Sequence, residues 1–242
     1  MGKQYWRGGN MLYPVPAVMV SCGRPEERPN IITVAWAGTV CSSPAMVSIS
    51  VRKERYSYDI LKETGEFVIN LITRDLTYTT DFCGVRSGRD VDKFAQMHLT
   101  PLPSQHISAP GIAESPVNLE CKVTQVIPLG SHDMFLAEVL GVTVDEKYMD
   151  ENGKFHLNDA GLVAYSHGEY FELGEKLGKF GYSVAKKQAA KTESVTKSAK
   201  PSGAGKKAAS AENRTASKTE AGNRRKSASK TGSADKQKSR RK

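Results

Sequence analysis

Apolar and polar residues alternate over much of the chain before residue 185, and this alternation predicts β-strands. The clearest case is residues 45–51, where Val47, Ile49 and Val51 share one face and small polar residues share the other. A period of two is typical of a half-buried strand. The other strands that we expect are residues 15–21, 30–40, 66–72, 117–127, 133–144, 162–165 and 169–173.

Short helices are expected between some of these strands. Ser57 is a suitable N-cap for a helix over residues 58–64, and Gly65 follows it as a left-handed C′ residue. Further helices are predicted over residues 73–82, ending at Gly84, and from residue 92 onward.

The order of these elements favours a barrel over a parallel sheet. No long amphipathic helix alternates with the strands, as repeated parallel crossovers would require. The pair Asn152-Gly153 predicts a type I′ turn, the usual connection between antiparallel neighbours. The expected fold is therefore mainly β with helical decoration, a closed antiparallel barrel.

Charge divides the chain into two parts. Residues 186–242 hold 18 of the 35 basic residues and 4 of the 26 acidic residues, which leaves 17 basic and 22 acidic residues in 1–185. The second part has no aromatic residue, Leu, Ile or Met, so it cannot bury enough apolar surface to offset the entropy cost of ordering. We expect a folded domain over residues 1–185 and a disordered Lys/Arg-rich tail over residues 186–242.

Cysteine spacing and hydropathy exclude several classes of protein. The cysteines at positions 22, 41, 83 and 121 form no CxxC pair and no cluster with His, which argues against a metal site or a disulfide framework. No apolar run is long enough to span a bilayer, and Pro14 and Pro16 interrupt the apolar segment that a signal peptide needs. We expect a cytoplasmic protein without a membrane span.

Two segments have the composition of a phosphate site. Arg52 and Arg55 follow the strand over residues 45–51, and Ser57 lies where a helix begins. Guanidinium groups bind phosphate oxygens bidentately, and the free N–H groups of a first helical turn bind anions. The second segment is a polar, glycine-bearing loop with Cys83, Gly84, Ser87 and Lys93. A solvated turn remains the alternative for such cations.

Four segments together resemble the flavin reductase-like family, in particular its flavoredoxin-type members. They are TVAWAG at 33–38, SSPAMVSISVRKERYS at 42–57, DFCGVRSGRDVDKF at 81–94 and AYSHGEYFELGEKLGKFGYSV at 164–184. The likeness covers nearly all of residues 10–185, whereas the tail has no counterpart in it. The resemblance implies a split β-barrel that binds FMN at a homodimer interface and transfers electrons through this flavin.

The resemblance also assigns roles to residues. It implies that His167 lies near the redox face of the flavin, as a candidate catalytic residue; a structural or exposed histidine is the alternative. The implied cofactor-binding residues are Thr33, Val34, Ala35, Trp36, Ser50, Arg52, Arg55, Ser57, Cys83, Gly84, Ser87 and Lys93. For residues 31–36 a plain core strand is an equal alternative, and for Ser50 a solvent-facing serine.

The implied activity is that of an FMN-dependent oxidoreductase. It would take electrons from NAD(P)H or a protein donor and pass them to an acceptor. Because the sequence has no GxGxxG fingerprint, a pyridine nucleotide would dock transiently and not in a Rossmann domain. Two alternatives remain: an FMN-binding electron carrier without turnover, and a nucleic-acid or other polyanion binder that acts through the tail.

Overall fold

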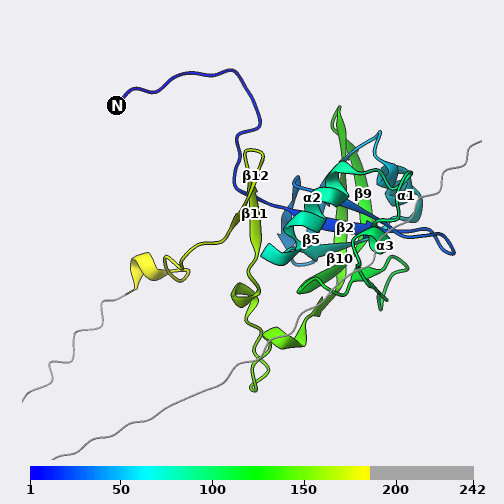
Figure 1. Ribbon diagram of the computed structural model, residues 1–242. Coiled ribbons are helices and arrows are strands. Elements are labelled where there is room, and N and C mark those ends of the chain that lie inside the picture. The colour runs from blue at the N-terminus through cyan, green and yellow to red at the C-terminus, as the bar shows by residue number, and fades with distance from the viewer. Residues whose placement is uncertain (186–242) are drawn as a thin grey trace, which may run out of the picture. The chain divides into compact units, whose positions relative to one another are not determined.

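Antiparallel strands are the main regular elements of the structure, a computed structural model that describes residues 1–185 (Figure 1). Contacts divide the chain into two units, Met1–Tyr182 and Ser183–Lys242. The expected disordered tail, residues 186–242, lies outside the described residues, so the tail and its boundary stay predictions. Within the described part, no helix is long and apolar enough to cross a membrane.

A seven-stranded antiparallel sheet carries the fold. Its strands, in spatial order, are β3 (Asn30–Val34), β2 (Val18–Cys22), β6 (Glu66–Leu71), β9 (Val117–Pro128), β10 (His132–Val144), β5 (Ala45–Arg52) and β4 (Ala37–Ser42). Smaller sheets are formed by β1 (Val15–Pro16) with β11 (Val163–Ser166) and β12 (Glu169–Glu172), and by β7 (Pro101–Leu102) with β8 (Gly111–Ile112).

The two edge strands of the large sheet are joined by only two residues, Ala35 and Trp36. A link of this length spans roughly 10 Å at most, so the opposite edges meet and the sheet curls into a barrel. Where they meet, the amide of Ser50 donates a hydrogen bond of 2.8 Å to the Trp36 carbonyl. β3 pairs with β2 whereas β4 pairs with β5, which leaves an opening between β3 and β5. The predicted split barrel is confirmed.

Two predicted strands are divided in the structure. The prediction of one strand over residues 30–40 was wrong because the chain changes partner at Ala35 and Trp36, from β2 to β5. The predicted strand over residues 15–21 likewise divides at Ala17, because β1 pairs with β11 and β2 pairs with β3 and β6.

The helices are short and lie outside the barrel, where α2 and α3 pack on the sheet (Figure 1). They are α1 (Tyr56–Thr64), α2 (Thr77–Val85) and α3 (Lys93–Gln96), with 3₁₀ turns η1 (Arg74–Leu76), η2 (Glu146–Tyr148), η3 (Leu157–Ala160) and η4 (Tyr182–Val184). Gly65 is the left-handed C-cap of α1, as predicted, with φ 64°.

Two details of the predicted helices were wrong. Ser57 is not an N-cap: α1 begins at Tyr56 after Arg55, and Ser57 lies buried in its first turn. Gly84 does not follow the second helix but lies inside α2, which extends to Val85. Both differences move a site residue onto a helix terminus.

The type I′ turn occurs at a different place from the predicted one. Asn152 does not have a positive φ, and only Gly153, at 76°, does; the Asp150 carboxylate instead holds this turn by accepting from two backbone amides. Positive φ at two successive residues is found at His167 (52°) and Gly168 (95°), between β11 and β12. This is the geometry of a two-residue hairpin turn.

Asn70, on β6, lies at the centre of a buried hydrogen-bond network that connects β6 with β2, β8 and β9. Its amide nitrogen donates to the Met19 carbonyl at 2.9 Å, and its carbonyl oxygen accepts from the Ile112 amide and the Asn118 side chain. Asn70 is fully buried, so each of these groups depends on its protein partner. The network attaches the proline-rich segment 101–116 to β6.

Asn70→Ala is expected to lower the free energy of unfolding by on the order of 3 kcal/mol, because it leaves buried donors and acceptors without partners. Urea titration followed by circular dichroism measures this loss. Asn152→Ala is the matched control, since the Asn152 side chain is exposed and should cost little. Equal losses in the two variants would show that the network does not stabilise the barrel.

Candidate cofactor site

Three adjoining cavities follow the opening between β3 and β5. The first, of about 230 Å³, lies between the start of α1 and the loop after α2. The second, of about 150 Å³, follows residues 33–36 and β5, and the third, of about 220 Å³, lies against the β11–β12 hairpin. Arg52 and Arg55 line both the first and the second cavity, and Ala35 and Trp36 line both the second and the third. The three therefore form one continuous trough.

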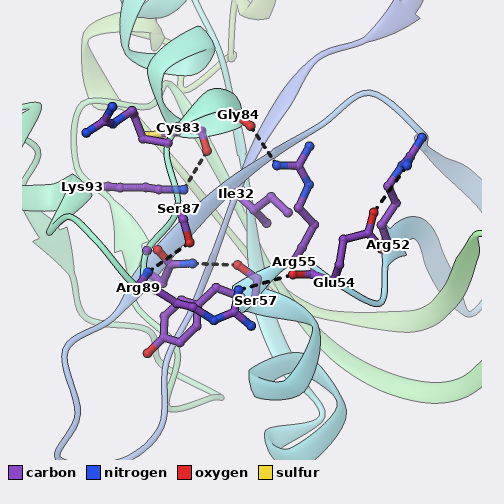
Figure 2. A pocket seen from close by; sticks show the side chains of 14 residues that line it. Ile32, Arg52, Glu54, Arg55, Ser57, Cys83, Gly84, Ser87, Arg89 and Lys93 are labelled. Carbon is purple, nitrogen blue, oxygen red and sulfur yellow. Dashed lines mark hydrogen bonds and ion pairs between the residues drawn. The ribbon is translucent and has the colours of Figure 1, made fainter.

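The first cavity is strongly cationic. Its charged lining residues are one acid, Glu54, and five cations, Arg52, Arg55, Arg86, Arg89 and Lys93. Figure 2 shows Arg55 and Lys93 reaching toward the Gly84 and Cys83 carbonyls from opposite sides in this view. Because like charges repel at short range, this arrangement favours a bound anion.

The start of α1 adds backbone donors to this cavity. Arg55 occupies the N-cap position with extended backbone, and no side chain caps the helix. The first-turn N–H groups thus lack a side-chain partner at the end where the helix dipole favours an anion. The Asn30 amide donates to the Ser57 hydroxyl at 2.7 Å and fixes this turn to β3.

The loop after α2 closes the cavity from the other side. A Cβ on Gly88 would lie 2.1 Å from the Asn30 Oδ1 and 2.7 Å from the Tyr56 ring, so only glycine fits this approach. Next to it, the amide of Arg89 donates to the Ser87 hydroxyl at 3.2 Å. The Arg89 guanidinium donates to the Glu54 carbonyl at 3.3 Å and lies 5.4 Å from the centre of the Tyr56 ring (Figure 2).

Lys93 forms the floor of the first cavity. Its ammonium group is buried and donates to the Ile31 carbonyl at 2.6 Å and the Cys83 carbonyl at 2.7 Å. Burial lowers the pKa of Lys93 to about 8, and the nearby charge of Arg55 acts in the same direction. Burial also raises the pKa of the Cys83 thiol to about 11, so this thiol is protonated at neutral pH. Lys93 therefore joins β3 to α2 beneath the cavity.

The second cavity is uncharged along residues 33–36. Thr33, Val34, Ala35 and Trp36 line it together with Ser50 across the barrel opening. At its other end lie Arg52, Arg55 and His132. Burial and, after it, the charge of Arg52 lower the pKa of His132. The structure thus brings residues 33–36 and Ser50, which the resemblance implies for cofactor binding, next to the arginines of the predicted phosphate site.

His167 is the exception among the predicted site residues. It lies at the tip of the β11–β12 hairpin, with its ring 5.9 Å from the Tyr13 ring, and it lines none of the three cavities. Its catalytic role stays a prediction. From the hairpin itself, Tyr165 and Tyr170 line the third cavity, and so does Tyr13, the neighbour of His167.

Sequence reasoning missed several lining residues. Arg86, Gly88 and Arg89 belong to the loop that was singled out, and a count of its cations would have included the two arginines. Asn30 and Tyr13 carry no local signal, because only the closed barrel brings them to the trough.

Comparison with known proteins agrees with this arrangement. Residues 10–174 match the model of the flavin reductase like domain. The chain belongs to the flavin reductase-like family. Flavoredoxin of Desulfovibrio vulgaris (Miyazaki F) is 33% identical, with a TM-score of 0.70 over 76% of this chain and 100% of that chain.

Two further relatives extend the comparison. An uncharacterised Archaeoglobus fulgidus protein is 31% identical over 160 residues, which are 66% of this chain and 88% of the relative. An FMN-binding protein from Thermus thermophilus, solved with 1-cyclohex-2-enone, has the same fold, with a TM-score of 0.61 and 23% identity over 74% of this chain and 97% of that chain. The match to the flavin reductase-like family thus spans residues 10–174.

Lys93→Met is expected to remove a pH dependence of stability. From pH 8 up to the ordinary lysine pKa of 10.5, the unfolded chain binds the Lys93 proton and the folded chain does not, so rising pH favours folding. The stability of the native protein minus that of Lys93→Met should therefore rise between pH 7 and pH 9, by on the order of 1 kcal/mol.

Urea titrations of both proteins at the two pH values measure this difference. Lys154→Met is the control for the chemical change itself, because Lys154 is exposed. A constant difference between the native protein and Lys93→Met would contradict the assignment of a buried charge.

Proposed function

We propose that the protein binds FMN in the trough and acts as an oxidoreductase that passes electrons from NAD(P)H to an acceptor. One observation carries this proposal: the cationic first cavity adjoins the mainly uncharged second cavity, with which it shares Arg52 and Arg55. FMN has matching parts, because a ribityl chain joins its phosphate dianion to a flat ring. The likeness to flavoredoxin and to the Thermus thermophilus FMN-binding protein supports the same cofactor.

The phosphate belongs in the first cavity. Arg55 and Arg89 supply guanidinium donors from two sides, Ser57 lies in the first turn of α1, and Ser87 lies on the closing loop. Lys93 contributes its charge from below while its hydrogen bonds hold the Ile31 and Cys83 carbonyls. Charge-assisted hydrogen bonds of this type are the strong ones, and they fix the orientation of the ligand.

The flavin ring belongs along residues 33–36. The side chains of Thr33, Val34 and Ala35 are small, so a flat ring can approach the backbone, and Trp36 adds an aromatic wall. Ser50 and Arg52 lie across the opening, where the ribityl chain would pass. Gly84 lines the trough in close contact with Thr33: a Cβ on Gly84 would lie only 3.2 Å from the Thr33 Cβ.

Bound flavin supplies hydride or single-electron transfer, and the protein's residues bind it, orient it and set its surroundings. No acid–base pair in the trough is needed for this role. A reductant such as NAD(P)H would dock transiently against the exposed face of the ring. An electron carrier without turnover is the second candidate, since flavoredoxin is among the relatives.

We also propose that the protein is a homodimer. Val40 on β4 and Leu140 and Val142 on β10 are exposed aliphatic side chains on strands of the barrel. A contiguous exposed apolar patch marks an interaction site, and on this proposal these three side chains contribute to one. The cytoplasmic location and a polyanion partner for the tail stay predictions.

Arg55→Ala and Arg89→Ala should each weaken FMN binding roughly 10- to 100-fold, because a charge-assisted hydrogen bond contributes about 1.5–3 kcal/mol. Quenching of flavin fluorescence measures the dissociation constant. Arg74→Ala is the control, because Arg74 pairs with Glu172 and lines none of the three cavities. A protein that stays colourless in excess FMN, or equal affinities in all three variants, would contradict the assigned site.

The FMN-loaded protein should oxidise NADH or NADPH in the presence of ferricyanide, because the acceptor reoxidises the bound flavin and allows repeated turnover. Loss of the reduced nicotinamide absorbance measures the rate. Bound FMN without any NAD(P)H oxidation would favour the electron carrier over the reductase.

A further inference from the structure

The third cavity differs in chemistry from the other two. Its lining contains no charged residue, and it consists of Tyr13, Ala17, Thr33, Ala35, Trp36, Gly84, Tyr165 and Tyr170. We refer to it as the tyrosine cavity. Its volume of about 220 Å³ is below the range of roughly 300–1,000 Å³ that is usual for drug-sized ligands, so it suits a molecule of one or two rings.

The aromatic side chains around the tyrosine cavity come from three distant parts of the chain. The Tyr13 ring lies 6.2 Å from the Trp36 ring and 6.3 Å from the Tyr165 ring. Tyr165 and Tyr170 face each other across the β11–β12 hairpin at 5.4 Å, edge to face. Aromatic walls at such separations offer faces and edges to a further planar ring.

The polar side-chain groups of the cavity include the hydroxyls of its three tyrosines. The Tyr170 hydroxyl donates to Asp81 at 3.5 Å. Among residues 1–185, the hydroxyls of Tyr13 and Tyr165 have no hydrogen-bond partner, although both side chains are partly buried. Tyrosine hydroxyls that line a cavity commonly find a partner when it is filled.

We propose that the tyrosine cavity binds the electron acceptor, and that this acceptor is a small, uncharged, planar ring compound such as a quinone. The inference rests on the proposed function, because the cavity shares Thr33, Ala35 and Trp36 with the cavity assigned to the flavin ring. A ring in the tyrosine cavity therefore lies beside the cofactor, where electrons can pass between the two.

The lining of the tyrosine cavity favours an uncharged ligand, because none of the residues that line it is charged. Asp81 accepts from the Tyr170 hydroxyl, and Arg55 donates to the Gly84 carbonyl at 3.4 Å, so an acid and a base both adjoin the lining. An aromatic carboxylate or the phosphates of a dinucleotide would lose hydration in this cavity without gaining a charged partner from its lining.

The overall reaction balances with a quinone. NAD(P)H, one proton and the quinone give NAD(P)⁺ and the hydroquinone, so two electrons leave the nicotinamide and reach the quinone oxygens with two protons. Duroquinone is a suitable probe because its ring is fully substituted and uncharged.

The experiment compares acceptor use in three variants of the FMN-loaded protein. Tyr165→Leu should raise the KM for duroquinone about tenfold and leave the KM for NAD(P)H unchanged, because it removes an aromatic wall of the acceptor's cavity alone. Tyr165→Phe should restore most of the affinity. Tyr78→Leu is the matched control, since Tyr78 is 77% exposed on α2 and lines none of the cavities.

Direct binding separates this inference from the proposed function. Saturation-transfer NMR should show that benzamide, which is planar and uncharged, binds more tightly than benzoate or cyclohexanecarboxamide, and that Tyr165→Leu weakens the binding of benzamide.

Two results would overturn the inference. A Tyr165→Leu effect on the KM for NAD(P)H would assign the cavity to the donor, and equal benzamide binding in Tyr165→Leu and Tyr78→Leu would show that Tyr165 is not part of the binding site. Benzamide binding to a protein that takes up no FMN would instead refute the proposed function and leave the cavity as an aromatic site.

Discussion

The structure depends on one covalent constraint, the two-residue link between opposite edges of the large sheet. Ala35 and Trp36 force β3 and β4 to continue one another, so the sheet has to curl until β5 reaches the same chain. The change of pairing partner at this link leaves an opening between β3 and β5. The cavities assigned to the cofactor's phosphate and ring both adjoin this opening, so barrel closure and site formation have the same cause.

Electrostatics in the first cavity favour binding at the expense of stability. Burial lowers the pKa of Lys93, and the nearby charge of Arg55 acts in the same direction, so holding the charged lysine here costs stability. A phosphate dianion between them would relieve both effects, because an opposite charge favours the protonated lysine. By linkage, such a ligand stabilises the folded chain as it binds. Loop 86–89 can close over the cavity because Gly88 has no side chain to collide with Asn30.

Local patterns predicted the elements of the fold better than their connections. The alternation over residues 45–51 identifies β5 because every second side chain, at Val47, Ile49 and Val51, is apolar and buried. Nothing local marks the break at Ala35, because it arises from a change of partner. Ser57 has the composition of a cap, yet it sits in the helix because its hydroxyl accepts from Asn30, a residue 27 positions earlier. Tertiary contacts likewise bring Asn30 and Tyr13 to the trough.

His167 has a structural role in the backbone of the β11–β12 turn. Its φ of 52°, followed by 95° at Gly168, makes the tight turn between β11 and β12. That turn sets the hairpin register in which Tyr165 lies opposite Tyr170. A different loop length would shift the register, and a shift of one residue would move one of the two tyrosines to the other face. The backbone of His167 thus helps to set the positions of Tyr165 and Tyr170, and it is the side chains of these tyrosines that line the tyrosine cavity.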